Sequence, residues 1–481
     1  MKFTSMTENT GAIPSTESEL QGTVRRIVEQ NMPGSVSTLT DLVRIPSVSW
    51  DAFDRAFVAQ SADAVASLLE QTGAFDSVIV SQAETPEGSL GQPAVLASRA
   101  AKNGRPTVLL YAHHDVQPPG DDADWESAPY EPTIRGDRLY GRGASDDKAG
   151  VVSHIASVRA LVEATSNEFD LGLVVFIEGE EEFGSRSFSA FLDKHRDQLE
   201  ADVIVVADSD NWNVDTPALT ISLRGNVTFK LTVRTLEHAS HSGMFGGAAP
   251  DAMLAAVRLL ASLHGDDGSV AVEGLVGSDG ATPDYPESQL ANEAGFVGGV
   301  TSIGRGSILS RLWFQPAITV TGIDAPSVAN ASNTLLPQVA VRISSRIAPG
   351  QKASDAFEAI ESHLRQHAPF GATIEISDVD LGDAFLVDTT GWAVREAKTA
   401  MKDGWGVDPV DTGIGGSIPF ISDLARVFPS AQILVTGVED PDTRAHSPNE
   451  SQHLGVLKRA ILSEAFLLAR LNGRTLAELS E

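Results

Sequence analysis

Histidine and carboxylate side chains follow several apolar stretches of this sequence. They occur in four places: His113-His114-Asp115 after residues 107–112, residues 178–182 after residues 173–177, Asp208-Ser-Asp210 after residues 203–207, and His446 in the loop after residues 432–435. Imidazole and carboxylate groups bind divalent metal ions, and the chain has no cysteine that could add a thiolate ligand. The sequence therefore predicts a metal site made only of His, Asp and Glu.

Strand periodicity distinguishes the two neighbouring histidines. If the backbone stays extended after residue 112, His113 and Asp115 lie on one face and His114 lies on the other. An aspartate two residues further on can accept the second ring N–H of a metal-bound imidazole and fix its tautomer. We therefore predict that His113 is the ligand and that Asp115 orients it.

A glycine-rich segment at residues 141–150 places Asp146 and Asp147 just before a predicted helix. Taken alone, this pattern also fits an ordinary N-terminal helix cap. The sequence contains neither of the glycine-rich phosphate-binding patterns, GxxxxGK[S/T] and GxGxxG, so nucleotide binding is not supported. It also lacks the GxSxG pattern of serine hydrolases, so a serine nucleophile of that type is not supported.

The apolar stretches indicate how these groups are brought together. Continuous apolar runs at residues 107–112, 173–177, 203–207 and 432–435 are typical of strands covered on both faces, as in a largely parallel α/β sheet with helices on both sides. Ligands bind at the carboxyl ends of such strands, so the groups that follow them are expected to converge. A final helix is predicted from residue 454 to Asn472-Gly473.

The middle of the chain has a different pattern. Apolar and polar residues alternate at 227–234, 339–343 and 372–376, which is typical of antiparallel strands with one solvated face. We therefore predict an inserted α+β lid or dimerisation domain at residues 218–381. It interrupts a catalytic domain at residues 19–217 and 382–481, and residues 1–18 are expected to be a flexible leader.

The charge of the chain excludes some partners. Lys and Arg total 35 and Asp and Glu total 65, which gives a net charge of −30 and disfavours binding to nucleic acids or anionic membranes. The N-terminus has no apolar signal segment, and no apolar run is long enough to span a bilayer. The sequence therefore predicts a cytoplasmic protein.

The motifs as a set resemble the aminoacylase/carnosinase family of dizinc peptidases, in its carnosinase-like dipeptidase branch. The resemblance rests on seven segments in order: His113-x-Asp115, Gly141-Arg-Gly-x-x-Asp146-Asp147-Lys, Glu178-Gly-x-Glu181-Glu182-x-Gly-Ser, Ser209-Asp210-Asn211, His241-Ser-Gly-x-Phe-Gly-Gly, Gly415-Gly-Ser-Ile-Pro and His446-Ser-Pro-Asn-Glu. The match covers most of the chain. Glu180 and Phe183 depart from the residues common in relatives, but neither is at a ligand position.

The resemblance implies two Zn²⁺ ions per subunit, with Mn²⁺ or Co²⁺ able to take their place. The implied ligands are His113 and Asp210 for one ion, Glu182 and His446 for the other, and Asp146 as the bridge between them. The peptide bond between Asp146 and Asp147 is cis in this family. Glu181 is implied as the general base.

Further residues in the predicted inserted domain and after it are implied by the resemblance alone. His241 would stabilise the oxyanion together with Asn333 and Thr334, Arg346 would bind the substrate carboxylate, and Gly416 and Ser417 would contact the substrate through the backbone. Without the resemblance, Arg346 also fits a surface ion pair. The family commonly forms a two-fold dimer through the inserted domain, in which the histidine reaches the partner's active site.

These implications predict the hydrolysis of the amide bond of dipeptides or short peptides. Glu181 would take a proton from the attacking water and deliver it to the leaving amine. The main alternative within the same fold is an N-acyl-amino-acid deacylase. A remote alternative from another class is an inactive metal-binding scaffold, which would be expected to have lost a ligand or the base.

Overall fold

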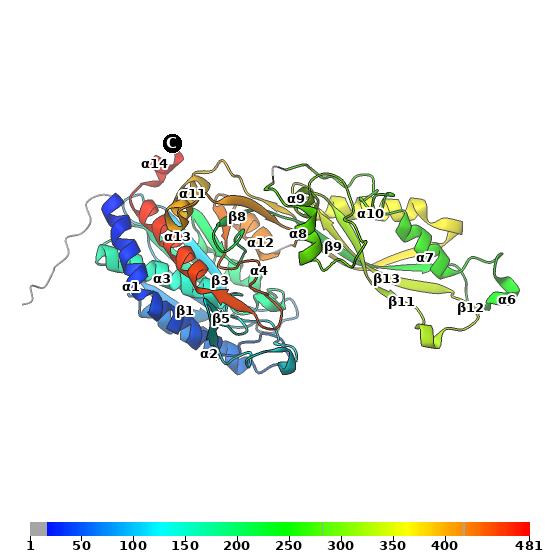
Figure 1. Ribbon diagram of the computed structural model, residues 1–481, viewed down its shortest axis with the longest axis horizontal. Helices are drawn as coiled ribbons and strands as arrows, with labels where there is room; N and C mark the ends of the chain where they lie inside the picture. The colour runs from blue at the N-terminus through cyan, green and yellow to red at the C-terminus, as the bar shows by residue number, and fades with distance from the viewer. Residues whose placement is uncertain (1–16, 281, 417–418) are drawn as a thin grey trace, which may run out of the picture. The chain divides into compact units, whose positions relative to one another are not determined.

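The computed structural model describes residues 17–280, 282–416 and 419–481 (Figure 1). The chain divides into two compact units: unit 1 is Met1–Thr220, Asp388–Val410 and Ala425–Glu481, and unit 2 is Ile221–Val387 and Asp411–Leu424. The predicted boundaries at 218 and 381 lie near this division, but the sequence did not predict that residues 411–424 belong to unit 2. Most of the predicted leader lies outside the described residues, and helix α1 already begins at Glu17.

Unit 1 is built on one twisted sheet. Its strands, in spatial order, are β1 (Ser77–Ser81), β2 (Ala94–Arg99), β6 (Gly172–Glu178), β3 (Thr107–His113), β7 (Val203–Ala207), β17 (Gln432–Thr436) and β8 (Ala218–Leu223). The four strands β6, β3, β7 and β17 are parallel, and the strands on either side of them pair antiparallel. Every residue of β6 and β7 is buried, so both faces of the sheet are covered. The predicted α/β fold with a mostly parallel sheet is confirmed.

Helices surround this sheet. Those with residues in unit 1 are α1 (Glu17–Val43), α2 (Arg55–Glu70), α3 (Lys148–Thr165), α4 (Phe188–Lys194), α5 (Arg196–Leu199), α11 (Trp392–Trp405), α12 (Pro419–Val427), α13 (Leu454–Asn472) and α14 (Leu476–Ser480). Helices α1, α3, α11 and α13 pack against one another in a layer. Helix α13 begins and ends where the apolar spacing and the Asn472-Gly473 stop predict. No helix in the described part of the chain is long and apolar enough to cross a membrane.

A second, smaller sheet of unit 1 flanks two ligand-bearing loops. It consists of β4 (Thr133–Arg135), β5 (Arg138–Tyr140) and β18 (Ser451–His453), in the order β18-β5-β4. The loop that carries Asp146 follows β5, and the loop that carries His446 precedes β18. Pairing of these two strands therefore brings together segments that are far apart in the sequence.

Unit 2 contains a four-stranded antiparallel sheet. Its strands, in spatial order, are β11 (Ala317–Asp324), β13 (Gln338–Ile347), β9 (Gly225–Arg234) and β14 (Thr373–Gly382). Helices α7 (Ala252–Ala261) and α10 (Ala353–His367) contribute apolar side chains to the same buried core as β9 and β13. The alternation of buried and exposed residues in β9 agrees with the predicted half-covered strand.

The shorter elements of unit 2 complete this α+β arrangement. They are β10 (Ser240–His241), α6 (Ser242–Phe245), α8 (Glu287–Glu293), α9 (Ile308–Trp313) and β12 (Thr334–Leu335). In addition, β15 (Phe385–Leu386) and β16 (Val410–Ile414) pair with β8, the strand through which the chain passes from unit 1 into unit 2. Helix α7 is capped by Asp251, whose side chain accepts a hydrogen bond from the backbone N–H of Leu254.

Candidate metal centre

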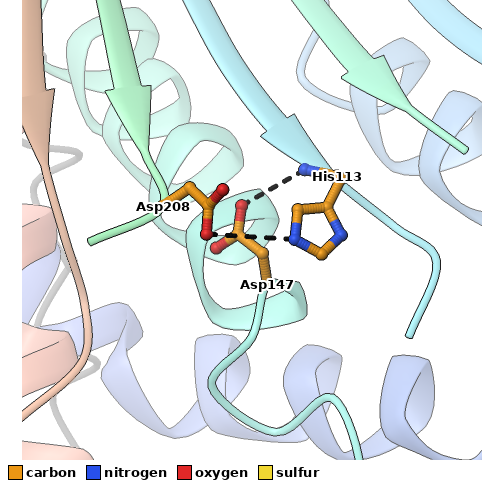
Figure 2. Close-up of side chains that lie close together, drawn as sticks. All are labelled: His113, Asp147 and Asp208. Atoms are coloured by element: carbon orange, nitrogen blue, oxygen red, sulfur yellow. Dashed lines mark hydrogen bonds and ion pairs between the residues drawn. The ribbon is translucent and has the colours of Figure 1, made fainter. Parts of the chain in front are cut away.

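Strand register brings the first group of candidate ligands together in unit 1. Strands β3 and β7 are parallel, and Tyr111 pairs with Val206. Continuing the same offset past the end of β7 aligns His113 with Asp208, so their side chains leave adjacent strands on the same face. Figure 2 shows these two side chains meeting Asp147, which precedes α3.

His113, Asp147 and Asp208 form a compact group whose candidate ligand atoms lie within 4.8 Å of one another. The ring Nε2 of His113 lies 3.9 Å from Oδ1 of Asp208. Asp147 differs from Asp208 because both of its oxygens accept backbone hydrogen bonds, from the N–H of His113 (3.2 Å) and from the N–H of Gly150 (3.2 Å). Asp147 therefore anchors the end of β3 to the start of α3.

Asp146, Glu182 and His446 form a second group, also within 4.8 Å. Nε2 of His446 lies 3.0 Å from Oδ2 of Asp146 and 3.2 Å from Oε2 of Glu182. Gln117 holds Glu182 in place, because the backbone N–H and the side-chain amide of Gln117 both donate to the Glu182 carboxylate. No role for Gln117 was predicted from the sequence. Its only sequence signal was its position in the segment after His113.

Asp146 joins the two groups. Its Oδ1 lies 3.1 Å from Nε2 of His113, whereas its Oδ2 faces His446. One carboxylate therefore presents a separate oxygen to each histidine. This is the arrangement expected of a ligand that bridges two ions, and the Asp146–Asp147 peptide bond is cis, as the resemblance implies.

The two neighbouring histidines point in different directions. Nδ1 of His113 lies 3.1 Å from the backbone oxygen of Asp115 and 3.3 Å from its Oδ1, which leaves Nε2 facing the carboxylate of Asp146. His114 instead places Nε2 2.9 Å from the backbone oxygen of Pro93. Burial lowers the pKa of His114 to about 4, so this ring is neutral at physiological pH.

Asp115 also positions the glutamates. Its Oδ1 accepts a hydrogen bond from the backbone N–H of Glu181 (3.1 Å), and its Oδ2 accepts from the backbone N–H of Glu182 (3.1 Å) and from the Ser49 hydroxyl (2.7 Å). Glu181 reaches the edge of the first group, where its Oε2 lies 4.0 Å from Nε2 of His113. Asp115 thus orients a histidine and two glutamates from one buried position.

The charges at this centre suit bound cations. Burial raises the pKa of Asp208 to about 6 and that of Glu182 to about 7, and it also raises the pKa of Glu181 above its usual value. Buried carboxylates crowded together are unstable as anions unless positive charge compensates them. The set of imidazole and carboxylate donors fits Zn²⁺, and it also fits Mn²⁺ or Co²⁺.

The structure does not bring Asp210 into either group. Asp210 forms an isolated parallel bridge with Glu439, and the backbone N–H of Asn211 donates to the backbone oxygen of Glu439. These contacts follow the end of β7 at Ala207, where the chain leaves the strand direction. Of the two aspartates, Asp208 lies in the group with His113.

The remaining predicted residues lie in unit 2. His241 pairs with Thr334 between β10 and β12, and the backbone N–H of Ser242 donates to the oxygen of Asn333, so three predicted contributors are neighbours. Arg346 lies in β13 opposite Asn226, Gly416 follows β16, and Ser417 is outside the described residues. Their part in the reaction stays a prediction.

Comparisons with known proteins concern the sequence and the fold. A family model for Peptidase family M20/M25/M40 matches residues 109–469. The cysteinylglycine-S-conjugate dipeptidase of Corynebacterium striatum is 34% identical over 369 residues, covering 76% of this chain and 81% of that protein. The β-Ala-His dipeptidase of Homo sapiens is 27% identical over 471 residues, covering 91% of this chain and 90% of that protein.

The solved structure of the dipeptidase Dug1p from Saccharomyces cerevisiae has a TM-score of 0.74 at 23% identity, covering 94% of this chain and 99% of that chain. That likeness concerns the fold. The family model matches the sequence itself, over a range that includes His113 and His446. The predicted resemblance to the dipeptidase branch is confirmed by these relatives. The chain therefore belongs to Peptidase family M20/M25/M40.

Proposed function

We propose that this chain is a dinuclear metallodipeptidase that hydrolyses the peptide bond of dipeptides. The observation that carries the proposal is the carboxylate of Asp146, whose two oxygens lie 3.1 Å and 3.0 Å from the ring nitrogens of two different histidines. A single-ion site would not need a carboxylate shared in this way. The dipeptidase relatives named above support the same activity.

The proposed ligands follow from the two groups. His113 and Asp208 would hold one ion, Glu182 and His446 would hold the other, and Asp146 would bridge them. Asp208 is proposed in place of Asp210 because Asp208 belongs to the group with His113, whereas neither candidate group includes Asp210. Zn²⁺ is the proposed ion, and Mn²⁺ or Co²⁺ suits the same donors.

The protein side chains would divide the reaction between them. Bound divalent ions supply a water nucleophile at neutral pH and polarise the scissile carbonyl group. Glu181 lies next to a proposed ligand without belonging to either group, so it is free to take the water proton and to pass it to the leaving amine. Asp115 fixes the positions of His113 and Glu181 relative to each other, because its carboxylate contacts the His113 ring and accepts a hydrogen bond from the backbone N–H of Glu181.

Asp208 and Asp210 provide a matched pair of substitutions. We expect Asp208→Asn to lose one metal equivalent and to reduce kcat/KM by about 100-fold or more, because it removes a charged ligand from the buried centre. Asp210→Asn is expected to retain both metals. Metal content by atomic emission and dipeptide turnover would be measured on both purified proteins.

The opposite pattern would reject this ligand assignment. If Asp210→Asn lost an ion while Asp208→Asn kept two, Asp210 would be the ligand, as the sequence analysis expected. Both variants preserve side-chain volume, so a difference between them reports on metal binding rather than on packing.

A substrate panel tests the dipeptidase activity itself. Dipeptides carry a free ammonium group that N-acyl amino acids lack, and the relatives named above are dipeptidases. We expect kcat/KM for dipeptides to exceed that for the N-acetylated amino acids with the same C-terminal residue by at least about tenfold. The reverse order would identify an N-acyl-amino-acid deacylase, and no turnover of either class would favour the scaffold alternative.

We also propose that unit 2 forms a two-fold dimer and supplies His241, Asn333, Thr334 and Arg346 to the reaction. Strand β11 lies at the edge of its sheet, and six of its eight residues are exposed. Large apolar side chains are exposed in the same unit, including Met244 (74%) and Val328 (96%). An open strand edge and exposed apolar groups in the same unit support pairing with a second copy.

Two further proposals concern the other substrate contacts and the cellular location. Gly416 and Ser417 would contact the substrate, as the resemblance implies, and Arg224 donates through Nε to the oxygen of Gly415 immediately before them. The location proposed from the sequence is the cytoplasm. Fractionation of cells that express the chain would test it.

A further inference from the structure

Glu450 is a fully buried carboxylate between the loops that carry two proposed metal ligands. Its side chain is 0% exposed. It accepts four hydrogen bonds from one loop: at Oε1 from the backbone N–H groups of Ser145 (3.0 Å) and Asp146 (3.1 Å), and at Oε2 from the backbone N–H of Gly143 (3.0 Å) and from Nη1 of Arg142 (2.7 Å). The four hydrogen bonds that this carboxylate accepts therefore all come from the segment that ends in Asp146.

The backbone around Glu450 is fixed as firmly as its side chain. Its carbonyl oxygen accepts from the N–H of Gly141, and the next residue, Ser451, pairs with Tyr140 in the β18–β5 ladder. Gln452 accepts a hydrogen bond from the hydroxyl of Ser145 at 2.7 Å. The strand that follows the His446 loop is thus joined to both ends of the Asp146 loop.

Asp146 depends on this support because its carboxylate has to face two histidines at once. The direction of its side chain is set by its own backbone, and the N–H of that backbone is held by Glu450. Arg142, which donates to Glu450, also donates through Nη2 to the backbone oxygen of Ser447 (3.5 Å), the residue after His446. Movement of Glu450 would therefore change the positions of Asp146 and His446 together.

We propose that Glu450 is a positioning residue of the metal centre, which fixes the spacing between Asp146 and His446 without binding an ion itself. This inference rests on the proposed dinuclear centre. Neither candidate ligand group includes Glu450. A buried Arg–Glu pair that served packing alone would stabilise the fold but would leave metal affinity unchanged in the folded protein.

Glu450→Gln tests the proposal on the full chain. The substitution keeps the volume but replaces one acceptor oxygen with an NH₂ donor, which would then face backbone N–H groups. We expect the affinity for Co²⁺ to fall by about 10- to 100-fold, as is usual when a group that orients metal ligands is lost. We also expect a change in the visible absorption of the Co²⁺-loaded protein, because that absorption depends on the geometry of the ligands.

Glu396→Gln is the matched control. Glu396 is also a buried glutamate in unit 1, in α11, and its carboxylate accepts hydrogen bonds from Arg470 (2.8 Å) and Arg474 (2.9 Å) rather than from a ligand loop. We expect this variant to lose thermal stability in the metal-free state and to keep the Co²⁺ affinity and absorption of the unmodified protein. The control therefore separates loss of a buried ion pair from loss of ligand positioning.

The possible outcomes are distinguishable. Co²⁺ affinities would be measured by competition with a chelator, beginning with the unmodified protein; if that protein binds no Co²⁺, the proposed function itself fails. If it binds two ions and Glu450→Gln matches it within twofold in affinity and has the same absorption, the positioning role is overturned. Should Glu450→Gln not fold, Glu450→Asp decides by the same measurement: it keeps the charge but is too short to reach the amides, and unchanged affinity would overturn the proposal.

Discussion

Protein freed of divalent metal ions is expected to lose all measurable dipeptide hydrolysis and to regain it when Zn²⁺, Mn²⁺ or Co²⁺ is added. The reason is that the imidazoles and carboxylates of the candidate centre, arranged around the shared Asp146, are proposed to hold the ions that supply the water nucleophile. Activity would be assayed after dialysis against a chelator and again after titration with each ion. Regain should require about two equivalents per chain if both groups bind.

Two controls accompany this experiment. The metal-free protein should retain its secondary structure by circular dichroism, because the sheet of unit 1 is covered on both faces by apolar packing that does not involve the centre. Ca²⁺ should restore less activity than Zn²⁺, since it prefers sites with more oxygen ligands and no imidazole. Full activity in a preparation verified to contain no metal would refute the proposed function.

Replacing Glu181 with Gln is expected to reduce kcat by about 10²- to 10⁴-fold while both metal equivalents are retained. This range is what a positioned general acid–base group contributes. Glu181 lies outside both ligand groups, whereas the neighbouring Glu182 lies within 3.2 Å of His446. Steady-state kinetics and metal analysis on the same preparation would check both parts of the expectation.

Loss of an ion from Glu181→Gln would show that Glu181 and Glu182 have exchanged the proposed roles.

The variant also allows the proposed dimer to be tested. If His241 serves the partner's active site, co-expression of Glu181→Gln with His241→Ala should yield mixed dimers with one intact site, and activity should reappear. Verified mixed dimers that stay inactive would show that His241 acts within its own subunit.

The sequence by itself determined the fold class, and it predicted most of the residues that gather at the candidate centre. Continuous apolar runs are typical of strands buried on both faces, and the polar groups that follow such strands are expected to meet where parallel strands end. Period-two alternation in an extended chain also distinguished His113 from His114 without any structure, because neighbouring residues point to opposite faces. In the structure, His113 faces Asp146 and His114 faces the backbone oxygen of Pro93.

Supporting contacts between distant segments were not visible in the sequence. Glu450 lies in a motif beside His446, but its four hydrogen bonds go to a loop that precedes it by about three hundred residues. Gln117 likewise holds Glu182 through contacts across the fold. Such pairings depend on which strands become neighbours, and local pattern does not specify that.

The choice between Asp208 and Asp210 as the proposed ligand rests on the tertiary structure and not on the sequence pattern. Two aspartates separated by one residue have the same parity in an extended chain, so alternation gives no reason to prefer either of them. The choice depends on where β7 ends and on its register with β3, which aligns His113 with Asp208. Beyond that point the chain turns to pair Asp210 with Glu439, and this turn is set by contacts with a segment more than two hundred residues away.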